Sequence, residues 1–182
     1  MRSNSYWFYQ GAYTPAQCQE ILNVFEQNPC RDLADLPAVA KKEADVALCR
    51  WYKVRHLLNA AQEVALWFNR HHIGFDVYPV TELDAVHLNT YHAPRGAYGW
   101  HQDATGPNAA TDMKLTVLVN VSTTAYSGGD LDLFQQGPER VAEFSAPGTV
   151  VVFPSWIPHQ EAEVTAGKRS TAAFWLLGPR LR

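Results

Sequence analysis

The chain has 182 residues, of which 47% are hydrophobic and 18% charged, a balance typical of one globular domain with a sizeable core. The formal net charge is −3, so the basic excess of a dedicated nucleic-acid binder is absent. No apolar run approaches the roughly 18 residues that suggest a membrane span, and the N-terminus lacks the apolar stretch of a secretory signal. We therefore expect no nucleic-acid or membrane partner.

The three cysteines, Cys18, Cys30 and Cys49, are odd in number and have no C-x-x-C spacing. This pattern argues against a disulfide framework and indicates a reducing compartment. The expected location is cytoplasmic. The sequence leaves the oligomeric state open.

Two amphipathic helices are predicted in the first 75 residues. The segment 14–29 starts with Thr14 as N-cap and Pro15 at the first helical position. A second helix is expected from about Arg55 to His71, where apolar residues recur at helical spacing. Residues 30–45 mix charged residues with Pro and Ala and predict an irregular connection.

After Gly74 the pattern changes to short runs rich in β-branched and aromatic residues, separated by Gly and Pro turn signals. The runs cover residues 86–94, 114–122, 129–136, 149–155 and 170–178. Helices followed by several short strands predict a mainly β fold with N-terminal helices, best described as a distorted jelly roll. We expect a single domain over residues 1–182, in which 1–75 are supporting helices and connection and 76–182 form the jelly-roll core with the site.

The stretch YGWHQDATG contains the first candidate metal ligands. On an extended strand His101 and Asp103 point to the same side. Together they supply two thirds of the 2-His-1-carboxylate set that binds non-haem Fe(II). Alone, however, an H-x-D motif is a weak signal.

A second stretch, GTVVVFPSWIPHQEAEVTAGKRSTAAFW, supplies the missing pieces. His159 follows a buried strand, and Arg169 comes ten residues later. Taken singly, the histidine could be a surface residue and the arginine solvent-facing. Taken together, three ligands leave open iron positions for a 2-oxo acid and dioxygen, and a guanidinium would receive the remote carboxylate of that acid. The order of the four residues is more specific than any one of them.

The second half of the chain resembles the Fe(II)/2-oxoglutarate dioxygenases, in particular the prolyl-4-hydroxylase-like branch with its small bacterial and phage enzymes. The matching stretches TYHAPRGAYGWHQDATG, KLTVLVNVS, SGGDLDLF and the segment from Gly148 to Pro179 lie within residues 86–179. The resemblance implies a double-stranded β-helix with a cupin-like jelly-roll core. It also implies that His101, Asp103 and His159 ligate iron and that Arg169 binds the distal carboxylate of 2-oxoglutarate.

Four further residues are assigned to the co-substrate site by the same resemblance: Tyr91, Leu118, Thr171 and Trp175. Each also has a simple packing role as an alternative, and Leu118, being apolar, could only pack. Tyr98 and Trp100 could line the substrate mouth or pack against neighbours. Gln102 or Asn89 could orient the metal ligands. The remaining histidines are interpreted as structural or exposed: His56, His71, His72, His87 and His92.

The activity implied by the resemblance is hydroxylation of an aliphatic C–H with release of succinate and CO2. The expected substrate is a prolyl residue or an amino-acid-like molecule, small or within a peptide. Fe(II), 2-oxoglutarate and O2 are the implied cofactors, with ascorbate as a candidate reductant. Nucleobase oxidation is disfavoured because Trp175 stands where those oxygenases place a second arginine.

Two other function classes stay open at this point. One is a cupin-type metal enzyme that does not use 2-oxoglutarate. The other is a catalytically inactive jelly-roll binding module.

Overall fold

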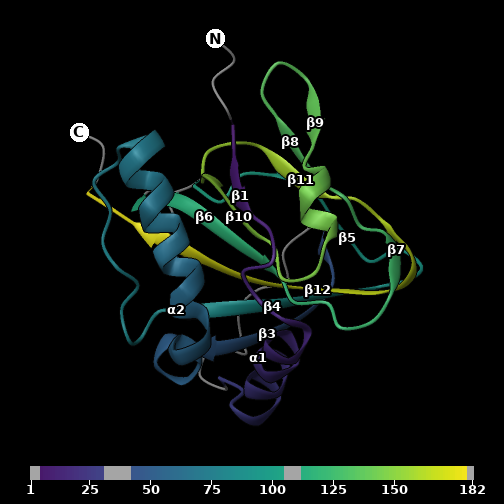
Figure 1. Ribbon diagram of the computed structural model, residues 1–182. Coiled ribbons are helices and arrows are strands. Elements are labelled where there is room, and N and C mark those ends of the chain that lie inside the picture. The colour runs from purple at the N-terminus through teal and green to yellow at the C-terminus, as the bar shows by residue number, and fades with distance from the viewer. Residues whose placement is uncertain (1–4, 31–41, 105–111, 180–182) are drawn as a thin grey trace.

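The computed structural model describes residues 5–30, 42–104 and 112–179. Two antiparallel sheets face each other, and two helices lie beside one of them (Figure 1). The architecture is the predicted jelly roll. The first strands of the core pair with strands far away in sequence, so that the site is assembled from distant segments.

The larger sheet has seven strands in the order β1-β10-β6-β12-β4-β3, with β7 also paired to β12. Their bounds are β1 Trp7–Tyr9, β3 Asp45–Arg50, β4 Ala85–His92, β6 Met113–Asn120, β7 Tyr126–Gly128, β10 Val150–Pro154 and β12 Val164–Leu177. The smaller sheet has five strands in the order β2-β5-β11-β8-β9. Their bounds are β2 Lys42–Glu43, β5 Ala97–His101, β8 Leu131–Phe134, β9 Pro138–Arg140 and β11 His159–Glu161.

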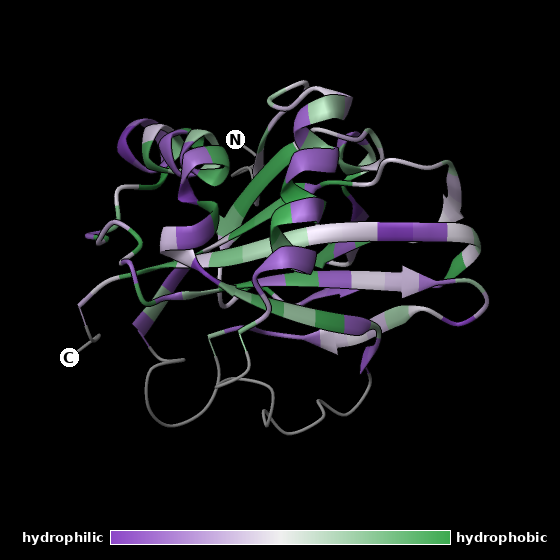
Figure 2. Cartoon of the chain, turned by 90° about the horizontal axis from the view of Figure 1, so that it is seen from below, coloured by the Kyte–Doolittle hydropathy of each residue, from purple (hydrophilic) through white to green (hydrophobic). Residues whose placement is uncertain are grey.

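The helices are α1, Pro15–Gln27, and α2, Trp51–Phe68, which continues into a π-helical turn η2 at Asn69–Ile73. A short 3-10 helix, η4, spans Ala142–Ser145. The start of α1 follows from its sequence because Thr14 and Gln17 form a capping box and Pro15 occupies the first turn. Both helices are amphipathic, and Figure 2 shows polar and apolar residues alternating along them.

Alternation along the central strands creates two apolar layers. On β6, Val117 and Val119 pack with residues of α1 and α2, including Ile21, Phe25 and Leu58. The intervening Leu118 packs into a second layer between the sheets, which also holds residues of β8, η4, β10 and β12: Leu131, Leu133, Phe144, Phe153 and Ala173. One face of the larger sheet is therefore covered by helices, while its other face forms the interior of the jelly roll.

The five predicted strand runs are confirmed, as is the helix that begins at Pro15. That helix ends at Gln27, with Asn28 as its C-cap. The second helix was predicted to start too late. It begins at Trp51, because the buried positions of its inner face already start there, and its N-cap Arg50 makes no side-chain capping bond that would mark the start.

The sequence did not predict five of the strands: β1, β2, β3, β7 and β9. The supposed irregular connection contains β2 and the start of β3, while residues 31–41 lie outside the described part of the chain. Strands β1, β2 and β9 are two or three residues long, which is too short for a periodicity to appear. The N-terminal segment thus contributes strands to both sheets as well as the two helices. Within the described residues, no helix is long and apolar enough to cross a bilayer.

Candidate metal and co-substrate site

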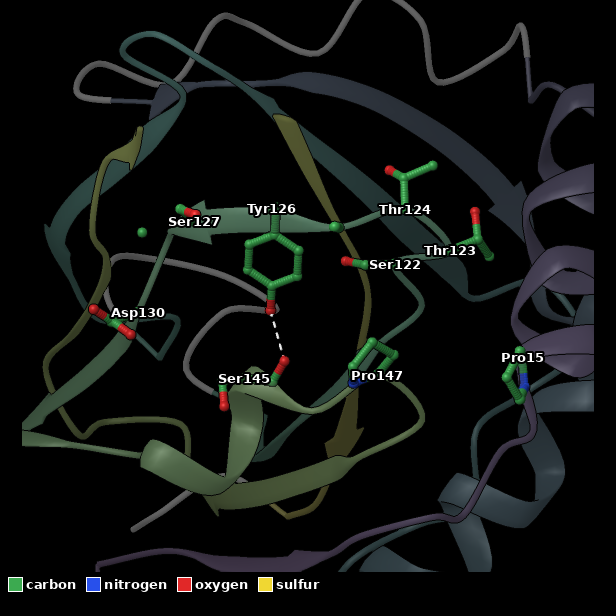
Figure 3. A pocket seen from close by; sticks show the side chains of 11 residues that line it. Pro15, Ser122, Thr123, Thr124, Tyr126, Ser127, Asp130, Ser145 and Pro147 are labelled. Atoms are coloured by element: carbon green, nitrogen blue, oxygen red, sulfur yellow. Dashed lines mark hydrogen bonds between the residues drawn. The ribbon is translucent and has the colours of Figure 1, made fainter. Parts of the chain in front are cut away.

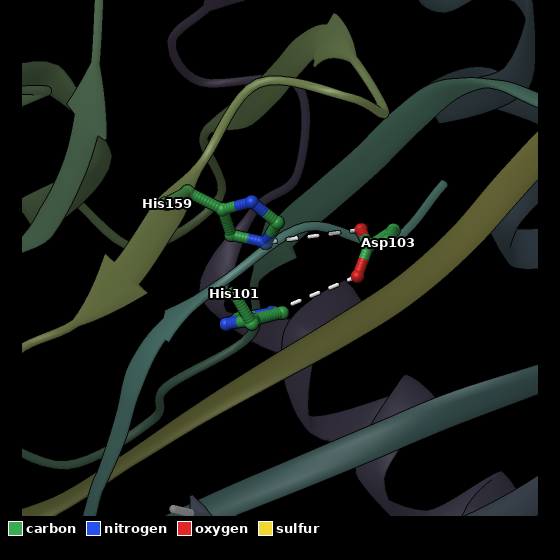
Figure 4. A group of neighbouring side chains, drawn as sticks. All are labelled: His101, Asp103 and His159. Carbon is green, nitrogen blue, oxygen red and sulfur yellow. Dashed lines mark ion pairs between the residues drawn. The ribbon is translucent and has the colours of Figure 1, made fainter. Parts of the chain in front are cut away.

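The predicted ligands His101, Asp103 and His159 come together at the ends of two neighbouring strands (Figure 4). His101 ends β5, Asp103 follows two residues later, and His159 starts β11. The antiparallel register pairs His159 directly with His101. One ligand atom from each residue lies within 4.8 Å of the others. Nothing else in the described residues forms a comparable group of three potential ligands.

Backbone carbonyls orient both imidazoles toward a common point. Nδ1 of His101 lies 2.9 Å from the carbonyl oxygen of Gly99, and Nδ1 of His159 lies 3.0 Å from that of Ile157. Since a carbonyl only accepts hydrogen bonds, each Nδ1 carries the proton and each Nε2 keeps its lone pair. The Nε2 atoms lie 3.6 and 3.7 Å from the carboxylate of Asp103. Both rings therefore present an unprotonated nitrogen beside a carboxylate.

Electrostatics favours the metal-binding form of His101. Burial lowers the pKa of His101, and the neighbouring His159 lowers it further. A lowered pKa keeps an imidazole neutral near neutral pH, which is the form that ligates a cation.

Asp103 is fixed by two donors from the larger sheet. Thr116 Oγ1 donates to Oδ2 of Asp103 at 2.7 Å, and Trp175 Nε1 donates to the same oxygen at 2.8 Å. Asp103 is thus held by Thr116 and Trp175 and not by Gln102 or Asn89, which were expected to orient the metal ligands. Gln102 Nε2 donates instead to the carbonyl of Trp156. Trp175, which the family resemblance assigned to the co-substrate site, thus also contacts a metal ligand.

Arg169 occupies the interior of the jelly roll behind these ligands. It is fully buried, and its Nη1 donates to the carbonyl oxygen of Gly129 at 2.7 Å. Its guanidinium carbon lies 4.9 Å from the ring centre of Phe144 and 5.7 Å from that of Tyr91. The arginine is directly opposite Tyr91 in the register of β12 and β4.

Several buried polar atoms around Arg169 have no hydrogen-bond partner among the described residues. They are Nε and Nη2 of Arg169, the hydroxyl of Tyr91 and the hydroxyl of Thr171. Buried polar atoms are normally paired, because leaving them unpaired costs free energy. All of these groups can donate, so a carboxylate is the ligand that would satisfy them.

The other predicted residues fall into packing positions. Leu118 is buried in the layer between the sheets and pairs with Ala173, consistent with the packing alternative. The Tyr98 ring stacks on the His101 imidazole at a centroid distance of 3.5 Å. Trp100 packs edge-on against Phe134.

Sequence reasoning missed Lys42 and Glu161, two residues near the site. His87, interpreted as structural or exposed, packs edge-on against Trp175 with ring centres 4.9 Å apart. Lys42 donates to the side-chain oxygen of Asn89 at 2.8 Å. Glu161 is buried two residues after His159. This spacing puts both side chains on the same face of a strand, so the position of Glu161 could have been predicted from the sequence. Lys42 carried no signal, because its strand is two residues long.

A separate open pocket of about 500 Å³ is lined by the segment 122–128 and by Asp130 and Pro147 (Figure 3). The hydroxyl of Tyr126 donates across it to the carbonyl oxygen of Ser145 at 3.0 Å. None of the metal-ligand or Arg169-site residues lines it. We therefore place the chemistry at the His101, Asp103 and His159 group, which has the convergent ligands.

The residues present fit Fe(II) and a 2-oxo dicarboxylate. Two imidazoles and one carboxylate are the donor set of a facial triad with open positions. The unpaired donors of Arg169, Tyr91 and Thr171 suit the far carboxylate of the acid.

Comparison with known proteins agrees with this geometry. The sequence model of the 2OG-Fe(II) oxygenase superfamily matches residues 86–177, half of the chain. A PKHD-type hydroxylase of Parvibaculum lavamentivorans is 35% identical over 81 residues, which cover 44% of this chain and 36% of the hydroxylase. The chain thus spans little more than a third of the length of the curated relatives that it matches.

Solved structures share the fold over nearly the whole chain. A Pseudomonas putida prolyl-4-hydroxylase superposes with a TM-score of 0.69 at 14% identity, covering 97% of this chain and 94% of that one. A Trichoplax adhaerens prolyl hydroxylase, solved with a hypoxia inducible factor peptide fragment, gives 0.70 at 16% identity, covering 97% and 84%. The family match contains both histidines, Asp103 and Arg169, and the chain belongs to the 2OG-Fe(II) oxygenase superfamily.

Proposed function

We propose that this chain is an Fe(II)- and 2-oxoglutarate-dependent dioxygenase that hydroxylates an aliphatic C–H. In this proposal His101, Asp103 and His159 bind the iron. Arg169, with Tyr91 and Thr171, binds the distal carboxylate of 2-oxoglutarate.

One observation carries the proposal. A fully buried guanidinium with two unpaired nitrogens, Nε and Nη2, lies in the same interior as three converging metal ligands. A buried charge without full hydrogen bonding is costly, so a protein that keeps one needs an anion to bind there. A dicarboxylate co-substrate would give Nε and Nη2 of Arg169 a partner, whereas a metal site that used none would leave both nitrogens unpaired.

The iron and its co-substrate would supply the oxidising chemistry, in which O2 is activated, 2-oxoglutarate becomes succinate and CO2, and a C–H becomes C–OH. The contribution of the protein is to position and to shield. The carbonyls of Gly99 and Ile157 hold the imidazoles, while Thr116 and Trp175 hold the carboxylate. The rings of Tyr98 and Phe153 pack against the imidazoles of His101 and His159 and limit their contact with solvent.

For the substrate, we infer a prolyl residue in a peptide or a proline-like amino acid. The support is the shared fold with prolyl hydroxylases, one of them solved with a peptide fragment. The curated relatives of this chain are PKHD-type hydroxylases.

The test is an anaerobic titration of the Fe(II)-loaded protein with 2-oxoglutarate, followed through the visible charge-transfer band of the chelate. The wild type should develop the band. Asp103→Ala should bind little iron and show none. Arg169→Ala should retain iron and need at least about tenfold more 2-oxoglutarate, because a charged hydrogen-bonding partner is lost.

Arg140→Ala is the matched control, since Arg140 forms surface ion pairs with Asp130 and Asp132 away from the metal ligands. It should titrate like the wild type. A protein that binds iron without developing the band would support the cupin-type alternative. A protein that does not retain iron would support the inactive binding module.

A further inference from the structure

A buried carboxylate lies in the interior that the co-substrate is proposed to occupy. Glu161 is 4% exposed, and its Oε2 has no hydrogen-bond partner in the described part of the chain. It shares the inward face of β11 with His159, because the two are separated by one residue, and it pairs with Tyr98 of β5. Such a group is unexpected where a dianion is to bind.

The charge of Glu161 acts on the donors around Arg169. Burial is the largest cause that raises the pKa of Tyr91, and the negative charge of Glu161 comes next, ahead of the opposing effect of Arg169. The charge of Glu161 therefore acts on a hydroxyl that would bind the distal carboxylate. Like charges in a low-dielectric interior repel strongly.

A lysine on the same sheet offsets this charge. Lys42 of β2 pairs with Tyr98, which in turn pairs with Glu161, so the three residues form one row across the smaller sheet. Lys42 Nζ lies 4.9 Å over the Tyr98 ring and donates to Asn89 on the opposite sheet. Burial lowers the pKa of Lys42, and Glu161 is the first of the charges that counteract this.

We propose that Glu161 and Lys42 are a compensating charge pair that sets how strongly the co-substrate pocket prefers a dianionic 2-oxo acid over a monoanionic one. The proposal rests on the proposed function of the site. Glu161 weakens binding of the distal carboxylate, and Lys42 restores it by cancelling the extra negative charge. Loss of the Glu161 charge alone therefore increases the preference for the dianion, and loss of the Lys42 charge alone decreases it. Loss of both charges restores the wild-type selectivity.

The charges in the interior balance once the metal and the co-substrate are bound. Asp103 and Glu161 are the acidic groups there, and Lys42 and Arg169 are the basic groups. With a divalent metal and a dianionic acid added, the sum is neutral. Neutralising Glu161 leaves the pocket more attractive to a dianion, whereas neutralising Lys42 leaves it less attractive. No direct ion pair is found between the two among the described residues, so the coupling acts through space.

The experiment measures binding by calorimetry on the Mn(II)-loaded full chain, which does not turn over. Two ligands are compared: 2-oxoglutarate, and 2-oxopentanoate, which has a methyl group in place of the distal carboxylate. We expect Glu161→Gln to lower the dissociation constant of 2-oxoglutarate roughly tenfold and Lys42→Met to raise it roughly tenfold. The dissociation constant of 2-oxopentanoate should change less in both variants. The double variant should return to near the wild-type ratio.

Two matched controls test whether location matters. Glu163→Gln removes an exposed carboxylate two residues along the chain from Glu161. Lys53→Met removes an exposed lysine that also lies over a tyrosine ring, Tyr52, on α2. Neither should change the ratio of the two affinities.

A second readout needs no ligand. Without metal or co-substrate, Lys42→Met should lower the melting temperature of the chain that has Glu161, because a buried carboxylate loses its counter-charge. The same change in the Glu161→Gln background should have a smaller effect. This comparison also reveals any variant that fails to fold.

The outcomes separate the two proposals. If the wild type binds no 2-oxoglutarate, the proposed function fails, and the charge-pair proposal fails with it. If the wild type binds it but neither substitution changes the affinity ratio, or both change it in the same direction, only the charge-pair proposal is overturned.

Discussion

The indole Nε1 of Trp175 donates a 2.8 Å hydrogen bond to Oδ2 of Asp103, a residue 72 positions earlier in the chain. This bond links the last long strand of the larger sheet to the loop that follows β5. It fixes the carboxylate in the orientation in which the two imidazoles face it.

Trp175→Phe should therefore weaken metal binding while the fold is retained. Phenylalanine keeps most of the packing surface but donates no hydrogen bond. Loss of a partner that orients a metal ligand typically costs about 10–100-fold in affinity. Mn(II) affinity can be measured by competition with a chelator, using Trp67→Phe, an exposed tryptophan on α2, as the control. Equal affinities in both variants would contradict this role of Trp175.

Arg169→Lys should recover only part of the 2-oxoglutarate affinity lost in Arg169→Ala. A lysine supplies the positive charge but not the planar fork that pairs with two carboxylate oxygens. It would also lose the rigid contact that Arg169 Nη1 makes with the Gly129 carbonyl. We expect a dissociation constant between those of the wild type and the alanine variant, roughly tenfold above the wild type. A lysine variant equal to the wild type would show that charge alone is recognised.

Gly129→Ala should destabilise the protein and weaken co-substrate binding together. Gly129 has φ of +68°, and an added Cβ would lie 2.9 Å from Cγ2 of Val164 and 3.1 Å from Cδ of Arg169. The left-handed conformation alone costs about 1–3 kcal/mol for a residue other than glycine. Urea unfolding and 2-oxoglutarate titration measure the two effects. Gly137→Ala is the control, because nothing lies within 4 Å of its Cβ position.

His87 should make the stability depend on pH in mildly acidic solution. Burial is the main cause that lowers the pKa of His87 from 6.5 to about 4, and the charge of Lys42 contributes further. Between these values the unfolded chain takes up a proton that the folded chain does not, so the free energy of unfolding falls as the pH falls. The loss amounts to roughly 3 kcal/mol at most once the pH is below the folded pKa.

The measurement compares urea unfolding of the wild type and His87→Gln from pH 7.5 to 4. The difference between the two free energies should change with pH in the window below pH 6.5, in the direction that favours the variant in acid. Parallel profiles would show that His87 does not titrate differently in the folded state.

Local sequence patterns determined a large part of this protein. The capping residue Thr14 and the following Pro15 fixed the start of α1, because helix ends are decided by nearby residues. Runs rich in β-branched and aromatic residues between turn signals identified the central strands, and the spacing of His101 and Asp103 put both on one strand face. The order of His101, Asp103, His159 and Arg169 was enough to suggest their chemistry.

The tertiary structure decided which residues meet across the sheets. The pairing of β11 with β5 brings His159 beside His101, and the pairing of β12 with β4 sets Arg169 opposite Tyr91. Thr116, Lys42 and Glu161 gained their places near the site in the same way, through long-range register. Register depends on the packing of whole sheets, so no local pattern reveals it. For the same reason the short strands β1, β2 and β9 are defined by their pairing with neighbouring strands and by no pattern of their own.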